Sequence, residues 1–137
     1  VEFFLTLLLH YFFDKLSKVS IIERAKVNFF EIVKEKNFYL IAEAADAHYG
    51  SVDRALEMVT RAKNAGADAI KFQHHIPEEE MLRTIPMSSN MTEPLYDFLK
   101  RNALTIDQHK TISDYCAEMK ITYLCTPFSL FAAQELE

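Results

Sequence analysis

The spacing of the apolar residues changes at about residue 38. Residues 38–42 form a short, continuous apolar run, which is typical of a strand buried on both faces in a parallel sheet. Ser51 then precedes apolar residues at helical spacing, and it is a suitable N-cap. Gly66 follows where a helix favours a left-handed residue, and residues 69–73 form the next apolar run. The pattern therefore predicts a strand, a helix and a second strand in this order.

The same alternation continues to the end of the chain. A helix near residues 95–101 precedes Thr105 and Gln108, which are spaced as a capping box at the start of a longer helix. A third strand is predicted at residues 121–125, and Ser129 can cap a last helix. This order implies right-handed parallel crossovers, in either an open doubly wound sheet or a (β/α)8 barrel. Since a barrel needs about 250 residues, this α/β chain would supply a partial (β/α)8 TIM barrel of about three β/α units.

Residues 1–37 contain neither glycine nor proline and are predicted to form a helical, apolar N-terminal extension. Their most hydrophobic stretch, residues 1–13, is shorter than the roughly 20 apolar residues of a membrane span. It also lacks the basic start of a signal peptide. We therefore expect a packing or oligomerisation element in a homo-oligomer, without a membrane span, followed by the α/β domain at residues 38–137.

Composition narrows the classes of function. The 15 basic and 20 acidic residues give a net charge of −5, which disfavours nucleic acid as a partner. The two cysteines, Cys116 and Cys125, lack the spacing of a zinc site or of a disulfide framework. A protein of the reducing cytoplasm fits this cysteine content best.

Candidate chemistry lies where the predicted strands end. Side chains alternate along a strand, so Lys71 and Gln73 share one face, which Glu43 and Thr126 continue on the other two strands. Parallel α/β proteins place active sites at this carboxyl edge. Lys71 most needs an explanation, because an ammonium within an apolar strand is costly without a counter-charge. Either an anionic ligand or a salt bridge to Glu43 would supply that charge.

Four segments of the chain carry a family resemblance. They are Tyr39-Leu40-Ile41-Ala42-Glu43, His48-x-Gly50-Ser51, Ala65-Gly66-Ala67-Asp68-Ala69-Ile70-Lys71-Phe72-Gln73 and Tyr123-Leu124-Cys125-Thr126-Pro127-Phe128. In this order they resemble successive blocks of the N-acetylneuraminate (sialic acid) synthase family. The resemblance covers about the last hundred residues.

The resemblance implies an enzyme that condenses phosphoenolpyruvate with an N-acetylated amino sugar, usually N-acetylmannosamine, to a nine-carbon sialic acid and phosphate. Carbon 3 of phosphoenolpyruvate would attack the open-chain aldehyde, water would add at carbon 2, and phosphate would leave by C–O cleavage. A divalent metal, Mn2+ or Mg2+, would act as a Lewis acid on the aldehyde oxygen. The family's metal ligands, and the antifreeze-like domain that reaches into the partner's site in a dimer, would lie beyond the stretch that ends at Glu137.

The family's site residues carry over at five positions. Lys71 resembles the lysine that holds phosphoenolpyruvate, and an ammonium suits its phosphate or carboxylate. Gln73 would hydrogen-bond in the same pocket, and Thr126 would donate its hydroxyl to phosphate. Glu43 resembles the catalytic glutamate that contacts the sugar and moves protons. His48 resembles a substrate-binding loop histidine, and its alternative role is a hydrogen bond that fixes the loop.

The chain departs from the family pattern around these blocks. Ala45 and Lys120 stand where glycines are usual, and Ala47 and Tyr49 stand at two asparagine positions. His74 follows Gln73 where threonine is common. These changes affect the loop that would bind the sugar more than the residues that would bind phosphoenolpyruvate.

Two further interpretations come from the remaining sequence. The loop at residues 74–90, which carries two histidines and three glutamates in a row, is predicted to be a solvated lid rather than a metal cluster. Because three parallel strands leave sheet edges open, the chain is expected to be a fragment or to assemble with further copies. The alternatives are a synthase of legionaminic acid, pseudaminic acid or a spore-coat sugar, and a non-catalytic remnant that serves only assembly.

Overall fold

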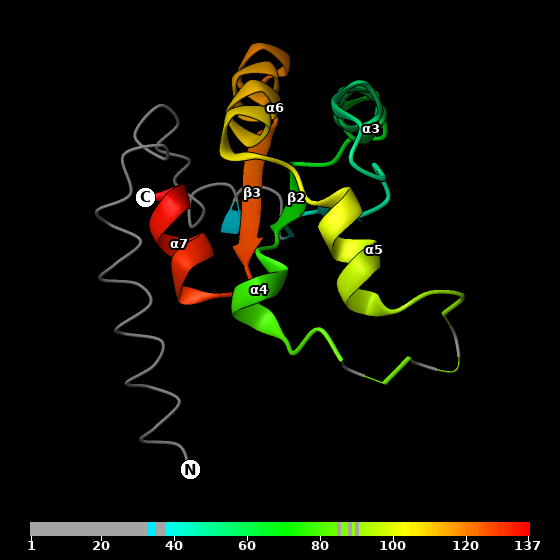
Figure 1. The fold of residues 1–137 in the computed structure, drawn as a ribbon. Helices are drawn as coiled ribbons and strands as arrows, with labels where there is room; N and C mark the ends of the chain where they lie inside the picture. The colour runs from blue at the N-terminus through cyan, green and yellow to red at the C-terminus, as the bar shows by residue number, and fades with distance from the viewer. Residues whose placement is uncertain (1–32, 35–37, 85, 88, 90) are drawn as a thin grey trace.

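The computed structural model describes residues 33–34, 38–84, 86–87, 89 and 91–137. The helical N-terminal extension predicted for residues 1–37, with its packing or oligomerisation role, falls almost wholly outside the described residues. In the described part, strands and helices alternate as the sequence predicts (Figure 1). The elements are β1 (Ile41–Ala45), α3 (Val52–Asn64), β2 (Ala69–His74), α4 (Pro77–Glu80), α5 (Leu95–Asn102), α6 (Ile106–Met119), β3 (Thr122–Pro127) and α7 (Leu130–Leu136).

The three strands form one parallel sheet in the order β1-β2-β3. Glu43 pairs with Lys71 across β1 and β2, and Gln73 pairs with Thr126 across β2 and β3. The crossover helices α3 and α6 lie side by side on one face of this sheet, and α4 lies near the carboxyl end of β3 (Figure 1). Sequential strand order with both crossovers on one face occurs in a (β/α) barrel segment and also in one half of an open doubly wound sheet.

Local sequence signals determine where the helices begin and end. Ser51 accepts a hydrogen bond from the backbone of Arg54, and Ser129 caps α7 in the same way. Thr105 and Gln108 form the predicted capping box at the start of α6. Gly66 ends α3 with a φ of 85°, a left-handed conformation that only glycine adopts without strain. These predictions are confirmed.

The core lies between the sheet and its two crossover helices. From β1 and β2 it receives the side chains of alternate residues, including Ala44, Ile70 and Phe72, and α6 contributes Ile112 and Cys116. The alternation predicted for the strands is therefore confirmed: one face packs on helices, and the face with Lys71 points away from them.

The boundaries of the first strand were predicted wrongly. The apolar run at residues 38–42 suggested a strand there, but β1 begins at Ile41 and continues to Ala45. Phe38 is 60% exposed, so it does not belong to the buried run. Pairing with β2 determines the strand, and a register shift between Glu43 and Ala45 accommodates the left-handed Ala45, with a φ of 44°. No helix in the described part is long and apolar enough to cross a membrane.

Candidate functional site

The first pair of candidate residues meets on the face of the sheet opposite the crossover helices. Lys71 Nζ lies 2.8 Å from Glu43 Oε2, so the two side chains form an ion pair between adjacent strands. The other carboxylate oxygen of Glu43 accepts a hydrogen bond of 3.3 Å from the backbone N–H of Ala45. Both charged side chains remain partly exposed, at 36% for Lys71 and 46% for Glu43. Both side chains of the pair are therefore accessible for contact with a ligand.

Gln73 and Thr126 lie closer to the carboxyl edge of the sheet than Lys71 does, by two residues along the strands. They are register partners on β2 and β3, and both are partly buried. By strand alternation, Gln73 shares the face of Lys71. Four of the five predicted site residues, Glu43, Lys71, Gln73 and Thr126, are thus brought to one face of adjoining strands. Together they offer an ammonium, a carboxylate, an amide and a hydroxyl.

His48 does not join this group. Its ring is 1% exposed and lies 6.0 Å from the ring of Phe72, on the helix-covered side of the sheet. Its Nδ1 accepts a hydrogen bond of 3.0 Å from the N–H of Gly50, and burial lowers its pKa. These contacts are those of the loop-fixing alternative.

A further polar cluster, which sequence reasoning missed, surrounds His75 just beyond β2. His75 Nδ1 lies 2.7 Å from Glu80 Oε2, and His75 Nε2 lies 3.1 Å from Gln73 Oε1. Asp46 Oδ2 lies 3.7 Å from the same Nε2, and the ring of Phe128 stacks on the imidazole. Burial raises the pKa of Asp46, an effect that the neighbouring His75 partly offsets.

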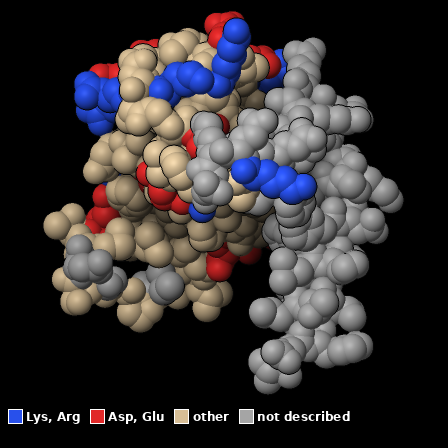
Figure 2. Space-filling view, turned by 180° about the vertical axis from the view of Figure 1, so that it is seen from behind, with Lys and Arg blue, Asp and Glu red and all other residues tan. Residues whose placement is uncertain are grey.

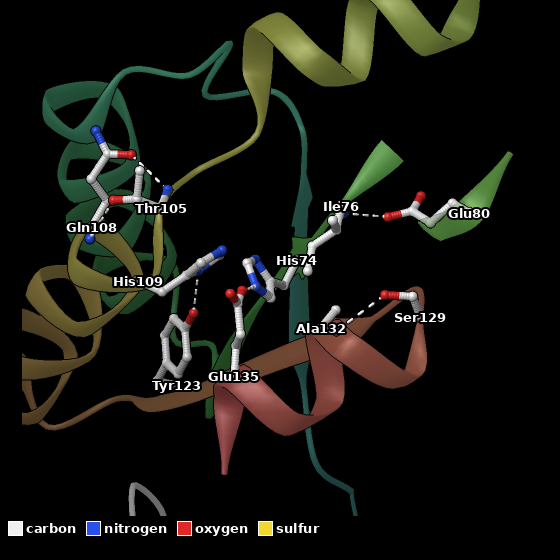
Figure 3. A network of polar contacts seen from close by, with 10 residues as sticks. All are labelled: His74, Ile76, Glu80, Thr105, Gln108, His109, Tyr123, Ser129, Ala132 and Glu135. Carbon is white, nitrogen blue, oxygen red and sulfur yellow. Dashed lines mark hydrogen bonds and ion pairs between the residues drawn. The ribbon is translucent and has the colours of Figure 1, made fainter. Parts of the chain in front are cut away.

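This cluster corrects the interpretation of residues 74–90 as a wholly solvated lid. His75 is 7% exposed as a residue, and the side chain of Glu80 is 5% exposed. Glu80 also accepts a hydrogen bond from the backbone N–H of Ile76, which fixes the short helix α4 at the sheet edge (Figure 3). Glu78 and Glu79 on α4 remain exposed, as does Leu82 in the later part of the loop, which is 79% exposed. The sequence signal for the contact of His75 with Glu80 is that Glu80 follows His75 by five residues, with the start of a helix between them.

A second histidine cluster lies on the helix-covered side. His109 Nδ1 is 2.7 Å from the hydroxyl of Tyr123, and His74 Nε2 is 2.8 Å from Glu135 Oε2 (Figure 3). The rings of His74 and His109 meet edge to face at 4.9 Å. Burial lowers the pKa of His109 to about 3, with a smaller contribution from His74, so this ring is neutral at pH 7. This cluster faces away from Lys71.

Charge on the described surface is mixed. In the view from behind, basic side chains gather mostly in the upper part of the molecule with acidic groups beside them (Figure 2). No group of three or more His, Cys, Asp or Glu residues within residues 38–84 and 91–137 is arranged to hold a metal ion.

Comparison with known proteins identifies the family. A model of the NeuB family matches residues 58–137, which are more than half of the chain. This chain belongs to the NeuB family. The match includes β2 and β3, and thus Lys71, Gln73 and Thr126.

Relatives within the NeuB family include several sugar-acid synthases. The N,N'-diacetyllegionaminic acid synthase of Legionella pneumophila is 31% identical over 96 residues, covering 66% of this chain and 27% of that protein. The pseudaminic acid synthase of Campylobacter jejuni is 42% identical over 50 residues, covering 36% of this chain and 15% of that protein. The crystal structure of the N-acetylneuraminic acid synthetase of Leptospira borgpetersenii, in complex with citrate, matches with a TM-score of 0.60 and 26% identity, covering 72% of this chain and 32% of that one. The chain therefore spans less than a third of the length of these relatives.

Proposed function

We propose that residues 38–137 form the N-terminal part of a NeuB-type (β/α)8 barrel that condenses phosphoenolpyruvate with N-acetylmannosamine or a related N-acetylated amino sugar. The products are a nine-carbon sialic acid and phosphate. Membership of the NeuB family and the sugar-acid synthases among the relatives support this assignment. The observation that carries it is the ion pair of Lys71 and Glu43 on the face of the sheet that the crossover helices leave uncovered.

Lys71 would bind the phosphate or carboxylate of phosphoenolpyruvate. An ammonium has three N–H donors, and the contact with Glu43 engages one of them. The others can bind an anionic ligand while Glu43 keeps the amine in place. Thr126 would donate its hydroxyl to the phosphate, and Gln73 would bind beside it.

Glu43 would serve the sugar side of the reaction. Glu43 lies in the middle of β1, and its carboxylate is held beside Lys71 by one oxygen on the ammonium and the other on the N–H of Ala45. There it would contact the amino sugar and move a proton as carbon 3 of phosphoenolpyruvate bonds to the aldehyde. Water adds at carbon 2, and cleavage of the C–O bond releases phosphate.

The resemblance implies a divalent metal, Mn2+ or Mg2+, which would supply Lewis-acid chemistry when bound. The described residues do not form a cluster that fits this ion. The roles proposed for Lys71, Glu43, Gln73 and Thr126 therefore concern substrate binding and proton transfer alone.

A second candidate shares the chemistry but differs in the sugar. Relatives named as legionaminic acid, pseudaminic acid and spore-coat polysaccharide proteins support this reading as well as they support sialic acid. The departures at Ala47 and Tyr49 lie in the loop that the resemblance associates with the sugar. Replacing N-acetylmannosamine by other N-acetylated sugars in the same assay distinguishes the two candidates.

The test uses the purified chain with phosphoenolpyruvate, N-acetylmannosamine and Mn2+. Binding of phosphoenolpyruvate is measured by calorimetry, and phosphate release is measured over a range of protein concentrations. Binding of phosphoenolpyruvate that is lost in Lys71→Ala supports the synthase, and so does any phosphate release that is lost with it. Absence of both at every protein concentration contradicts it and favours a non-catalytic remnant that serves assembly.

A further inference from the structure

We propose that His75 is a positioning residue, held as an imidazolium by Glu80 and Asp46, that turns the amide nitrogen of Gln73 toward the substrate. This inference rests on the proposed function, and it adds which partner donates the hydrogen bond between Gln73 and the substrate. Gln73 would act as a hydrogen-bond donor, suited to an oxygen of an anionic substrate such as phosphoenolpyruvate.

The hydrogen bonds of His75 indicate its protonation. Nδ1 faces a carboxylate oxygen of Glu80 at 2.7 Å, and Nε2 faces the amide oxygen of Gln73 at 3.1 Å. With Glu80 ionised and the amide oxygen of Gln73 placed on Nε2, as in this structure, both partners accept, and both ring nitrogens then donate. A ring that donates at both nitrogens carries a positive charge.

The surroundings of the ring favour that charge. Glu80 and Asp46 are largely buried, with side chains 5% and 18% exposed, and buried carboxylates need a cationic partner. Within the described part of the chain, the ion pairs found for these two carboxylates both involve His75. The ring of Phe128 stacks on the imidazole at 4.2 Å, where an aromatic face stabilises a cation. His48 is a further titratable group that acts on this cluster, and it interacts with both Asp46 and His75.

The consequence concerns the orientation of Gln73. A glutamine amide offers an oxygen acceptor on one side and an NH2 donor on the other. When the oxygen binds the His75 imidazolium, the NH2 group is left on the face shared with Lys71 and Thr126. A neutral His75 that donates to Glu80 would accept from Gln73 instead, and the amide would then turn its oxygen toward the substrate. The charge of one ring therefore decides which kind of substrate atom Gln73 can bind.

Two measurements test this inference on the full 137-residue chain. Long-range proton–nitrogen correlation spectra of the 15N-labelled protein at pH 7, with His75→Gln used for assignment, report the protonation of each ring nitrogen. We expect both nitrogens of His75 to be protonated, and a neutral ring would overturn the proposal.

The second measurement is a double-mutant cycle on phosphoenolpyruvate affinity. We expect His75→Gln and Gln73→Ala each to weaken binding by about tenfold, with no further loss when the two are combined. Glu80→Gln, which keeps the shape but removes the charge, should weaken binding as His75→Gln does. His74→Gln is the matched control, because His74 is also buried and paired with a carboxylate but lies on the opposite face, and it should leave the affinity unchanged.

The outcomes separate the two proposals. Losses that add in the double variant would show that His75 acts through general stability, and an unchanged affinity in Gln73→Ala would remove Gln73 from the site. Either result overturns the inference while the proposed reaction, with phosphoenolpyruvate bound by Lys71, stands. If the unmodified chain does not bind phosphoenolpyruvate, the proposed function fails, and the inference fails with it even if the spectra show a charged His75.

Discussion

Lys71 and Glu43 are direct register partners on adjacent parallel strands, and their side chains form an ion pair of 2.8 Å. Both side chains are partly exposed. Exposed ion pairs contribute about 0–1 kcal/mol to stability, so this one adds little to the fold. We therefore propose that this pair serves a ligand rather than stability.

The first prediction separates these two roles. Lys71→Met should change the free energy of unfolding by less than about 1 kcal/mol. It should nevertheless weaken phosphoenolpyruvate binding by roughly tenfold to a hundredfold, because a hydrogen bond to a charged group is worth about 1.5–3 kcal/mol. Urea denaturation and calorimetric titration measure the two effects. Lys110→Met, which breaks the exposed pair with Asp114 on α6, is the control and should leave binding intact. A large loss of stability in Lys71→Met with unchanged binding would contradict the prediction.

The second prediction concerns acid stability. Burial lowers the pKa of His109 from 6.5 to about 3, so the unfolded chain takes up a proton at this residue before the folded chain does. The free energy of unfolding should therefore fall as the pH drops below about 6.5, by up to about 1.4 kcal/mol per pH unit, until the folded protein also protonates His109. Urea denaturation at pH 7, 6 and 5 measures the slope. His109→Gln, whose amide oxygen can accept from Tyr123, should reduce it, and an unchanged slope in this variant would assign the effect to other groups.

The third prediction concerns the end of α6. Lys120 has a φ of 54°, a left-handed conformation that costs a non-glycine residue roughly 1 kcal/mol. Lys120→Gly should therefore raise the free energy of unfolding by about 1 kcal/mol, as measured by denaturation. The backbone carbonyl that accepts from Lys63 Nζ is retained in this variant.

The matched control is Gly66→Ala at the end of α3. A Cβ added to Gly66 meets nothing within 4 Å among the described residues, so only the backbone conformation, with a φ of 85°, opposes it. This variant should lose about as much stability as Lys120→Gly gains. Changes of the same sign in both variants would contradict the backbone argument.

The fourth prediction concerns thiol reactivity. Burial raises the pKa of both Cys116 and Cys125 to about 12. The thiolate is the reactive form, so at pH 8 each should be alkylated about a thousandfold more slowly than an ordinary exposed cysteine. Mass spectrometry after iodoacetamide treatment measures the modification of each residue, with the urea-unfolded chain as the reference. Rapid modification of Cys125 in the folded chain would show that β3 is more open than described.

The sequence predicted the fold well where the signals are local. The caps at Ser51, Thr105 and Ser129, and the left-handed Gly66, depend on contacts within four residues, and all are present. The parallel direction of the strands follows from the helical connection between each pair of strands. The limits of β1 depend instead on pairing with β2, which no local pattern reveals, and this is why its start was placed three residues too early.

In the candidate site, too, the features with local signals were predicted and those that depend on distant contacts were not. Strand alternation was enough to bring Glu43, Lys71, Gln73 and Thr126 to one face, although their roles stay predictions. The burial of His75 and Glu80 depends on the position of α4 at the sheet edge and on the ring of Phe128. Phe128 follows β3, far from His75 along the chain. A run of glutamates is usually solvated, so composition alone favoured a lid.

The parallel arrangement of β1, β2 and β3 also affects how the chain reaches its folded state. No strand in the described sheet can find its neighbour through a tight turn, because a complete helix separates each pair along the chain. We therefore expect the helices α3 and α6, which form from local contacts, to dock before the strands pair. Thr60 and Tyr115 link these helices through a hydrogen bond of 2.9 Å. A substitution that weakens this docking would slow folding, even though it leaves every strand unchanged.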